Sequence, residues 1–166
     1  MGLILAIDPG PTTCGVVMYR GGRDPRVFAA EAAESVGEVL ARITRAGELT
    51  AMVPPPLTVA IERVQSAGIS GASLLQTSEV VGRLQQRALD CGLRVRLVYR
   101  REVCAALHVS GAAKDAQVRQ RMIEMHPGGT GTRKNPGPLY GVSSHAWQAL
   151  GLAVAVTLMP QDTEST

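Results

Sequence analysis

Two short apolar segments, residues 3–8 and 57–62, each end in a carboxylate and each have the length and composition of a buried β-strand. Asp8 is followed at once by a Pro-Gly turn, and Glu62 is followed by a segment rich in Gly and Ser. A side chain at the carboxyl end of a strand in an α/β sheet faces the crevice where ligands bind. If the two strands are neighbours, the two acids lie close together and repel each other or take up a proton.

A hard divalent cation would remove that conflict, because oxygen ligands of this type suit Mg²⁺ or Mn²⁺. The pair Asp8 and Glu62 is therefore a candidate metal site. The alternative is that each acid is an ordinary strand-end residue that pairs with an arginine, such as Arg63 or Arg101.

The rest of the chain predicts an α/β fold with a five-stranded mixed sheet and helices on both faces. Further strands are expected at residues 14–20, 26–30 and 94–99, the first two completing an antiparallel meander with residues 3–8. Helices are expected from a Ser35–Glu38 capping box to about Gly47, and at residues 72–90, 101–108, 113–126 and 143–159. Residues 127–142 hold three prolines and five glycines and predict an exposed loop.

Composition indicates one globular domain. The 166 residues are 45% apolar and 19% charged, which excludes wholesale disorder. We expect one domain over residues 1–160 and a flexible tail over 161–166. Three dispersed cysteines, and the lack of a long apolar stretch, predict a cytoplasmic protein with no membrane contact. The net charge of +3 comes almost entirely from arginine, which is compatible with nucleic acid binding without proving it.

Four blocks of sequence resemble the RuvC-type Holliday junction resolvases, which have the RNase H-like fold. They occur in the family's order and span nearly the whole chain: residues 4–15 (ILAIDPGPTTCG), 59–64 (VAIERV), 111–118 (GAAKDAQV) and 145–153 (HAWQALGLA). The first two contain the strand-end acids. The third resembles the family's lysine-bearing helix start, and the fourth its last helix, whose pattern is D-x-x-D-A-L-x-x-A.

The resemblance implies a crossover junction endodeoxyribonuclease of DNA recombination and repair. Such an enzyme is a homodimer that nicks two opposing strands of a four-way DNA junction. It uses two divalent ions per active site, Mg²⁺ or Mn²⁺, and no nucleotide cofactor. The implied location is the cytoplasm of a bacterial cell, or of the host if the protein is encoded by a phage.

Carried over to this sequence, the family's metal site comprises Asp8, Glu62, His145 and Gln148. His145 and Gln148 are three residues apart and so share a helix face. Some family members have His at the third position, where a neutral imidazole can ligate a metal or handle protons. Gln148 stands where the family has its last Asp and contributes no negative charge, which predicts weaker metal binding and impaired activity.

The basic residues complete the predicted site. Lys114 lies near a helix N-terminus, against the preference of the helix dipole, and the resemblance makes it a catalytic contact to the scissile phosphate. Four further cations could extend a DNA-binding track along the phosphates: Arg119, Arg121, Arg133 and Lys134.

Two other functions remain open. A catalytically weakened or inactive junction-binding protein would keep the same DNA surface with its metal site disabled at Gln148. Residues 8–13 also resemble the first phosphate loop of sugar kinases and actin-like ATPases. Those proteins need two such domains, whereas a chain of this length supplies one.

Overall fold

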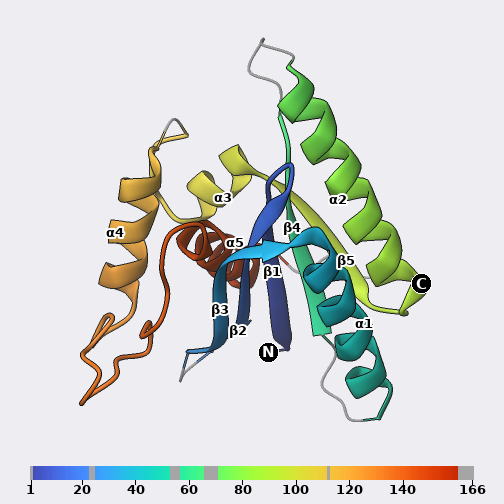
Figure 1. Cartoon of the computed structure of the whole chain (residues 1–166). Coiled ribbons are helices and arrows are strands. Elements are labelled where there is room, and N and C mark those ends of the chain that lie inside the picture. The colour runs from blue at the N-terminus through green and yellow to red at the C-terminus, as the bar shows by residue number, and fades with distance from the viewer. Residues whose placement is uncertain (1, 23–24, 53–56, 66–70, 112, 161–166) are drawn as a thin grey trace.

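The structure is a computed structural model that describes residues 2–22, 25–52, 57–65, 71–111 and 113–160. Ten elements follow one another along the chain (Figure 1): β1 (Leu3–Pro9), β2 (Thr13–Arg20), β3 (Arg26–Ser35), α1 (Val36–Met52), β4 (Leu57–Arg63), α2 (Ala72–Asp90), β5 (Arg94–Tyr99), α3 (Arg100–Ala106), α4 (Asp115–Met125) and α5 (Ala146–Leu158). The predicted tail lies outside the described residues, and the predicted extent of the domain stays a prediction.

The five strands form one mixed sheet in the order β3-β2-β1-β4-β5. β1 pairs antiparallel with β2, and β2 antiparallel with β3, which is the predicted meander. β1 pairs parallel with β4, and β4 parallel with β5. The predicted five-stranded mixed sheet is therefore confirmed, and the two acid-terminated strands are neighbours at its centre.

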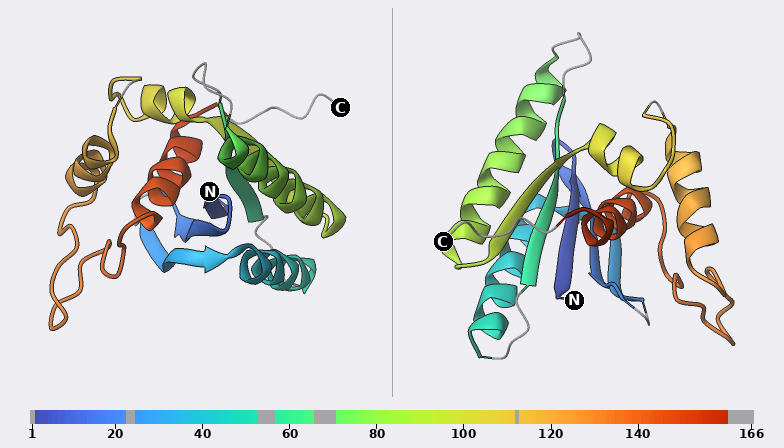
Figure 2. Two further views of the ribbon diagram at one scale, coloured as in Figure 1. Left: turned by 45° about the horizontal axis from the view of Figure 1, so that its top comes forward. Right: turned by 180° about the vertical axis from the view of Figure 1, so that it is seen from behind.

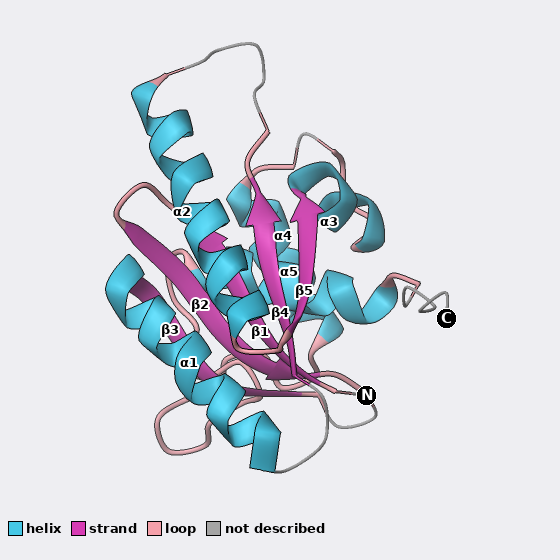
Figure 3. Cartoon of the chain, turned by 90° about the vertical axis from the view of Figure 1, so that its right-hand side faces the viewer, coloured by secondary structure: helices cyan, strands magenta, loops and turns pink. Residues whose placement is uncertain are grey.

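Helices cover both faces of the sheet because the strand side chains alternate between two apolar cores. Leu5 and Ile7 belong to the core under α1 and α2, whereas Ile4 and Ala6 belong to the core under α5. Figures 2 and 3 show α1 and α2 on one side of the sheet and α3, α4 and α5 on the other.

Helix α5 is the central element of the second core. Every residue from Ala146 to Val156 is buried, which suits a helix that is apolar on all sides. The helix packs on β1 and β2 on one side and on α4 on the other. At the α4 contact, a Cβ on Gly151 would lie 2.7 Å from Cγ1 of Val118, so a glycine is required for this close approach.

Several predicted boundaries are wrong, for local reasons. β3 continues to Ser35 rather than ending at residue 30. α1 continues past Gly47 to Met52, because Gly47 is a packing contact, where a Cβ would lie 2.7 Å from Cβ of Cys91. The last helix begins at Ala146 and not at residue 143, because Ser144 has a left-handed backbone with φ 42°.

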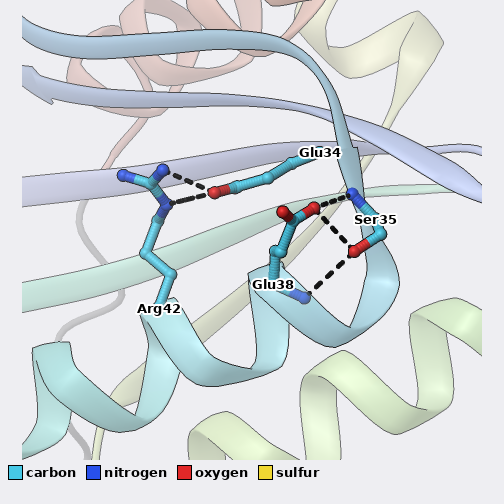
Figure 4. A network of polar contacts seen from close by, with 4 residues as sticks. All are labelled: Glu34, Ser35, Glu38 and Arg42. Atoms are coloured by element: carbon cyan, nitrogen blue, oxygen red, sulfur yellow. Dashed lines mark hydrogen bonds and ion pairs between the residues drawn. The ribbon is translucent and has the colours of Figure 1, made fainter.

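The capping box at the start of α1 is confirmed (Figure 4). The backbone N–H of Ser35 donates to Glu38 Oε2 at 2.8 Å, and the Glu38 N–H donates to Ser35 Oγ at 3.3 Å. Ser35 Oγ also donates to Glu38 Oε2 at 2.6 Å, and the hydrogen bonds from the side chain and then the backbone of Ser35 lower the pKa of the Glu38 carboxyl. Beside them, Arg42 holds Glu34 through its Nε, which donates to Oε1 at 3.1 Å, so the end of β3 is tied to the first turns of α1.

The segment 127–142 is exposed over most of its length, as predicted, but its last part is not. Leu139 and Val142 are buried in the core around α5, so the segment is anchored there before α5 begins. Its tip is a narrow turn closed by a bridge between Gly131 and Pro136. Among the described residues, no helix combines the length and apolarity needed to cross a membrane.

Candidate active site

Asp8 and Glu62 lie side by side at the carboxyl ends of β1 and β4. Ile7 and Ile61 are register partners in this parallel pair, and each acid is the next residue on its strand. Both acids line one hollow, together with Thr77 of α2. The juxtaposition predicted from the sequence is therefore present in the structure.

Burial and mutual repulsion make the charged forms of this pair costly. Burial raises the pKa of Asp8 to about 6, with Arg100 opposing the rise and Asp115 adding to it. Burial, followed by the charge of Asp8, raises the pKa of Glu62 to about 7. Glu62 Oε2 is buried and has no hydrogen-bond partner among the described residues. Two adjacent carboxylates with an unpartnered buried oxygen fit a divalent cation.

His145 reaches the same region from the start of α5. It caps the N-terminus of the helix, is exposed, and lines a second hollow together with Asp8 and Thr13. The close approach depends on Gly15 of β2, because a Cβ there would lie 2.5 Å from the His145 carbonyl oxygen. The structure therefore brings His145 next to Asp8, as the carried-over site requires.

Gln148 is buried, with 5% of its surface exposed, and it is not a surface residue of the last helix. Its amide oxygen accepts a hydrogen bond from Nη1 of Arg100. Within the described residues, no three His, Cys, Asp or Glu side chains form a metal-ligand cluster. Asp8 and Glu62 are the two carboxylates of the first hollow, and the amide of Gln148 is already used by a guanidinium.

Arg100 is the functional residue that the sequence reasoning missed. Its Nη1 lies 3.7 Å from Glu62 Oε2, which is an ion pair beyond hydrogen-bond length, and its Nη2 donates to Asp115 Oδ1 at 3.0 Å. The predicted alternative partners are wrong, because Arg63 and Arg101 lie against the Tyr99 ring instead, 5.1 and 5.3 Å from its centroid.

The position of Arg100 directly after β5 could have indicated that it lies beside the two acids. Tyr99 at the end of β5 is the register partner of Arg63, so the residue after β5 lies beside the carboxyl end of β4. Neighbouring parallel strands end at one edge of a sheet, and that edge is where Asp8 and Glu62 lie.

Two of the predicted basic residues, Lys114 and Arg119, lie at the N-terminal half of α4. Lys114 is exposed and directly precedes Asp115, the partner of Arg100, at the N-terminus of α4. Arg119 lies over the Trp147 ring, 5.3 Å from its centroid, and lines a hollow with Asp115 and His145. These two cations are near the acids.

Arg121, Arg133 and Lys134 are not brought to the acids. The Arg121 Nε donates to the carbonyl of Leu107 at 2.9 Å, and its Nη1 lies 3.5 Å from Glu124, so it serves the packing of α4. Arg133 and Lys134 are exposed in the turn of segment 127–142, which follows the C-terminal end of α4. Figure 1 shows this segment extending past the end of α4 that is opposite to the α3–α4 connection.

No protein-family model matches the sequence. Curated proteins named crossover junction endodeoxyribonuclease RuvC are similar to it, and two of them illustrate the match. The one from Mycobacterium avium is 31% identical over 122 residues, which are 69% of this chain and 64% of that protein. The one from Corynebacterium glutamicum is 30% identical over 123 residues, 69% of this chain and 55% of that protein. The chain thus matches less than two thirds of the length of these relatives.

The solved structures with a similar fold include two of Thermus thermophilus RuvC. A structure of Thermus thermophilus RuvC has a TM-score of 0.66 at 22% identity, and it covers 94% of this chain and 93% of its own. A structure of T. thermophilus RuvC in complex with Holliday junction substrate has a TM-score of 0.63 at 20% identity, with the same coverage of both chains. The predicted RNase H-like fold and the predicted family resemblance are confirmed.

Proposed function

We propose that this chain is a RuvC-type protein, a divalent-metal-dependent endonuclease that cuts four-way DNA junctions. The observation that carries the proposal is the pair of partly buried carboxylates, Asp8 and Glu62, which the β1–β4 register sets side by side. The name of its relatives, crossover junction endodeoxyribonuclease, favours cleavage over silent junction binding.

In this proposal Asp8 and Glu62 hold the metal, Mg²⁺ or Mn²⁺, through their carboxylate oxygens. A divalent ion at that position supplies a Lewis acid for the phosphodiester and lowers the pKa of a water molecule. In the same proposal His145, beside Asp8, ligates the metal or takes up a proton from the attacking water. Lys114 and Arg119 hold and orient the phosphate against the acids.

The DNA surface extends from these residues along α4. Arg133 and Lys134 are exposed beyond the far end of α4, where they are free to contact a phosphate of a more distant arm. Arg121 contributes least, because Leu107 and Glu124 already hold its guanidinium. The substrate we propose is branched DNA, recognised through phosphates on an extended surface.

We also propose that the protein acts as a homodimer, because two opposing nicks need two active sites. Leu75 and Leu89 on α2 are 70% and 51% exposed, and they lie fourteen residues apart, which is close to four helical turns. They therefore share the outward face of α2 and suit a twofold contact with a second copy. Light scattering of the parent and of a Leu75→Ser, Leu89→Ser variant tests this: a monomeric parent would contradict it.

The decisive experiment uses a synthetic four-way junction and a linear duplex with the same arm sequence, each with Mg²⁺, Mn²⁺ or EDTA. We expect paired nicks at symmetric positions of the junction, none in the duplex, and none in EDTA. Tight junction binding without nicks in either metal would instead identify a junction-binding protein. Equal cleavage of both substrates would refute junction selectivity.

A further inference from the structure

We propose that Arg100 is a built-in cation of the acidic centre, paired with Gln148, so that the centre takes one divalent ion, at Asp8 and Glu62, instead of two. The inference deepens the proposed function and rests on it for the identity of the metal site.

The first argument is the position of the guanidinium. Arg100 is the first residue of α3, directly after β5, and its side chain is 25% exposed. Its fork is held by groups from three elements: Glu62 of β4 at 3.7 Å, Asp115 of α4 at 3.0 Å, and the amide oxygen of Gln148 on α5. A guanidinium held by several planar partners has a fixed place and carries a positive charge.

The second argument is the chemistry of Gln148. A carboxylate at this position would offer a metal a charged ligand, whereas an amide oxygen bonded to a guanidinium has no charge to offer. The buried amide of Gln148 suits Arg100, because the guanidinium satisfies the buried amide oxygen and the amide adds no charge. Gln148 and Arg100 therefore act together. Gln148 puts a neutral amide where a charged metal ligand would stand, and Arg100 supplies a positive charge in place of a second metal ion.

The third argument is what Arg100 leaves open. It does not reach hydrogen-bond distance of Glu62 Oε2, and this buried oxygen has no other partner among the described residues. Asp115 is bonded to Arg100, so Asp8 and Glu62 are the two carboxylates left to hold and neutralise a single divalent ion. A second divalent ion would have to lie against the fixed guanidinium, and like charges repel.

The test is a count of bound Mn²⁺ by electron paramagnetic resonance on the full chain without DNA. We expect one Mn²⁺ per chain for the parent, and two for the double variant Arg100→Ser, Gln148→Asp. Gln148→Asp alone should still bind one, because Arg100 neutralises the added carboxylate. Arg101→Ser, which alters the neighbouring arginine on the Tyr99 ring, is the matched control and should bind one ion with the affinity of the parent.

Two Mn²⁺ bound by the parent, or a double variant that still binds one, would overturn the inference. If the double variant does not fold in a thermal melt, Arg100→Ser decides, because loss of the repelling guanidinium should tighten Mn²⁺ binding about tenfold; unchanged affinity would refute the inference. The count is independent of DNA cleavage. A parent that binds one Mn²⁺ but cuts no junction refutes the proposed function alone, and one that cuts junctions with two bound Mn²⁺ refutes this inference alone.

Discussion

Gly15 lies so close to His145 that a Cβ on the glycine would be 2.5 Å from the His145 carbonyl oxygen. Strand β2 and the first turn of α5 therefore touch through backbone atoms. This contact brings the imidazole of α5 next to the carboxylate of β1, so the geometry of the candidate site depends on a residue that carries no functional group.

The variant Gly15→Ala should damage the site. The added methyl group meets backbone atoms that have no rotamer to change, so we expect a loss of about 1–3 kcal/mol in the free energy of unfolding. Displacement of the first turn of α5 by about 1 Å should lower junction cleavage on the order of 10²-fold. Urea unfolding and junction cleavage measure both effects. Gly37→Ala is the control: a Cβ there meets nothing within 4 Å, so stability should rise by about 0.5–1 kcal/mol with normal cleavage.

Asp8→Asn should abolish junction cleavage and leave junction binding intact or stronger. The change removes a charged metal ligand while also removing negative charge near the phosphate. Gel-shift and cleavage assays on one labelled junction separate the two effects. Cleavage at the rate of the parent would show that the metal site lies elsewhere.

Lys114→Ala should weaken cleavage more than binding, because Lys114 lies at the end of α4 that is next to the acids. The double variant Arg133→Ala, Lys134→Ala should weaken binding more than cleavage of saturated complexes, because its residues lie beyond the other end of α4. Affinity should fall steeply with salt, with a smaller slope for the double variant. Kd and single-turnover rates at several salt concentrations test both, and a normal cleavage rate for Lys114→Ala would refute its catalytic role.

The metal-free protein should lose stability as the pH rises from about 4 to about 7. The pKa values of Asp8 and Glu62 are raised to about 6 and about 7, above their unfolded values, so the folded state binds more protons in this window. Arg100 and Asp115, which face the pair, act in opposite directions.

In EDTA, the Tm of the parent should therefore fall on the order of 5 °C from pH 5 to pH 8. Asp8→Asn should show a smaller fall, because one titrating group and its effect on Glu62 are both gone. Mg²⁺ at pH 8 should raise the Tm of the parent and leave that of Asp8→Asn nearly unchanged. A pH-independent difference between the two proteins would contradict the assignment.

The sheet and its central acids could be predicted because the chain marks them locally. Apolar strands end in acids before turn residues, and α2 and β5 have the predicted bounds. Between them, Gly92 has φ 68°, which a glycine adopts without strain. Such signals depend on a few neighbouring residues, so they survive without knowledge of the tertiary structure.

The partner of the acids could not be predicted in this way. Arg63, Arg100 and Arg101 are equivalent by composition, and only the register of β4 and β5 decides which of them faces Glu62. The role of Gln148 was equally hidden, because an isolated glutamine on a helix gives no sign that its amide is bonded to a guanidinium forty-eight residues away. Both facts belong to the pairing of distant segments.

Gly151 has a consequence for the distance between the proposed phosphate contacts and the proposed metal site. Because α4 rests on α5 at the point where a Cβ would lie 2.7 Å from Val118, the thickness of one methyl group sets the spacing between the helix that carries Lys114 and Arg119 and the helix that carries Gln148. A larger side chain at position 151 would push α4 away from α5, and the proposed phosphate contacts would then lie farther from the proposed metal site.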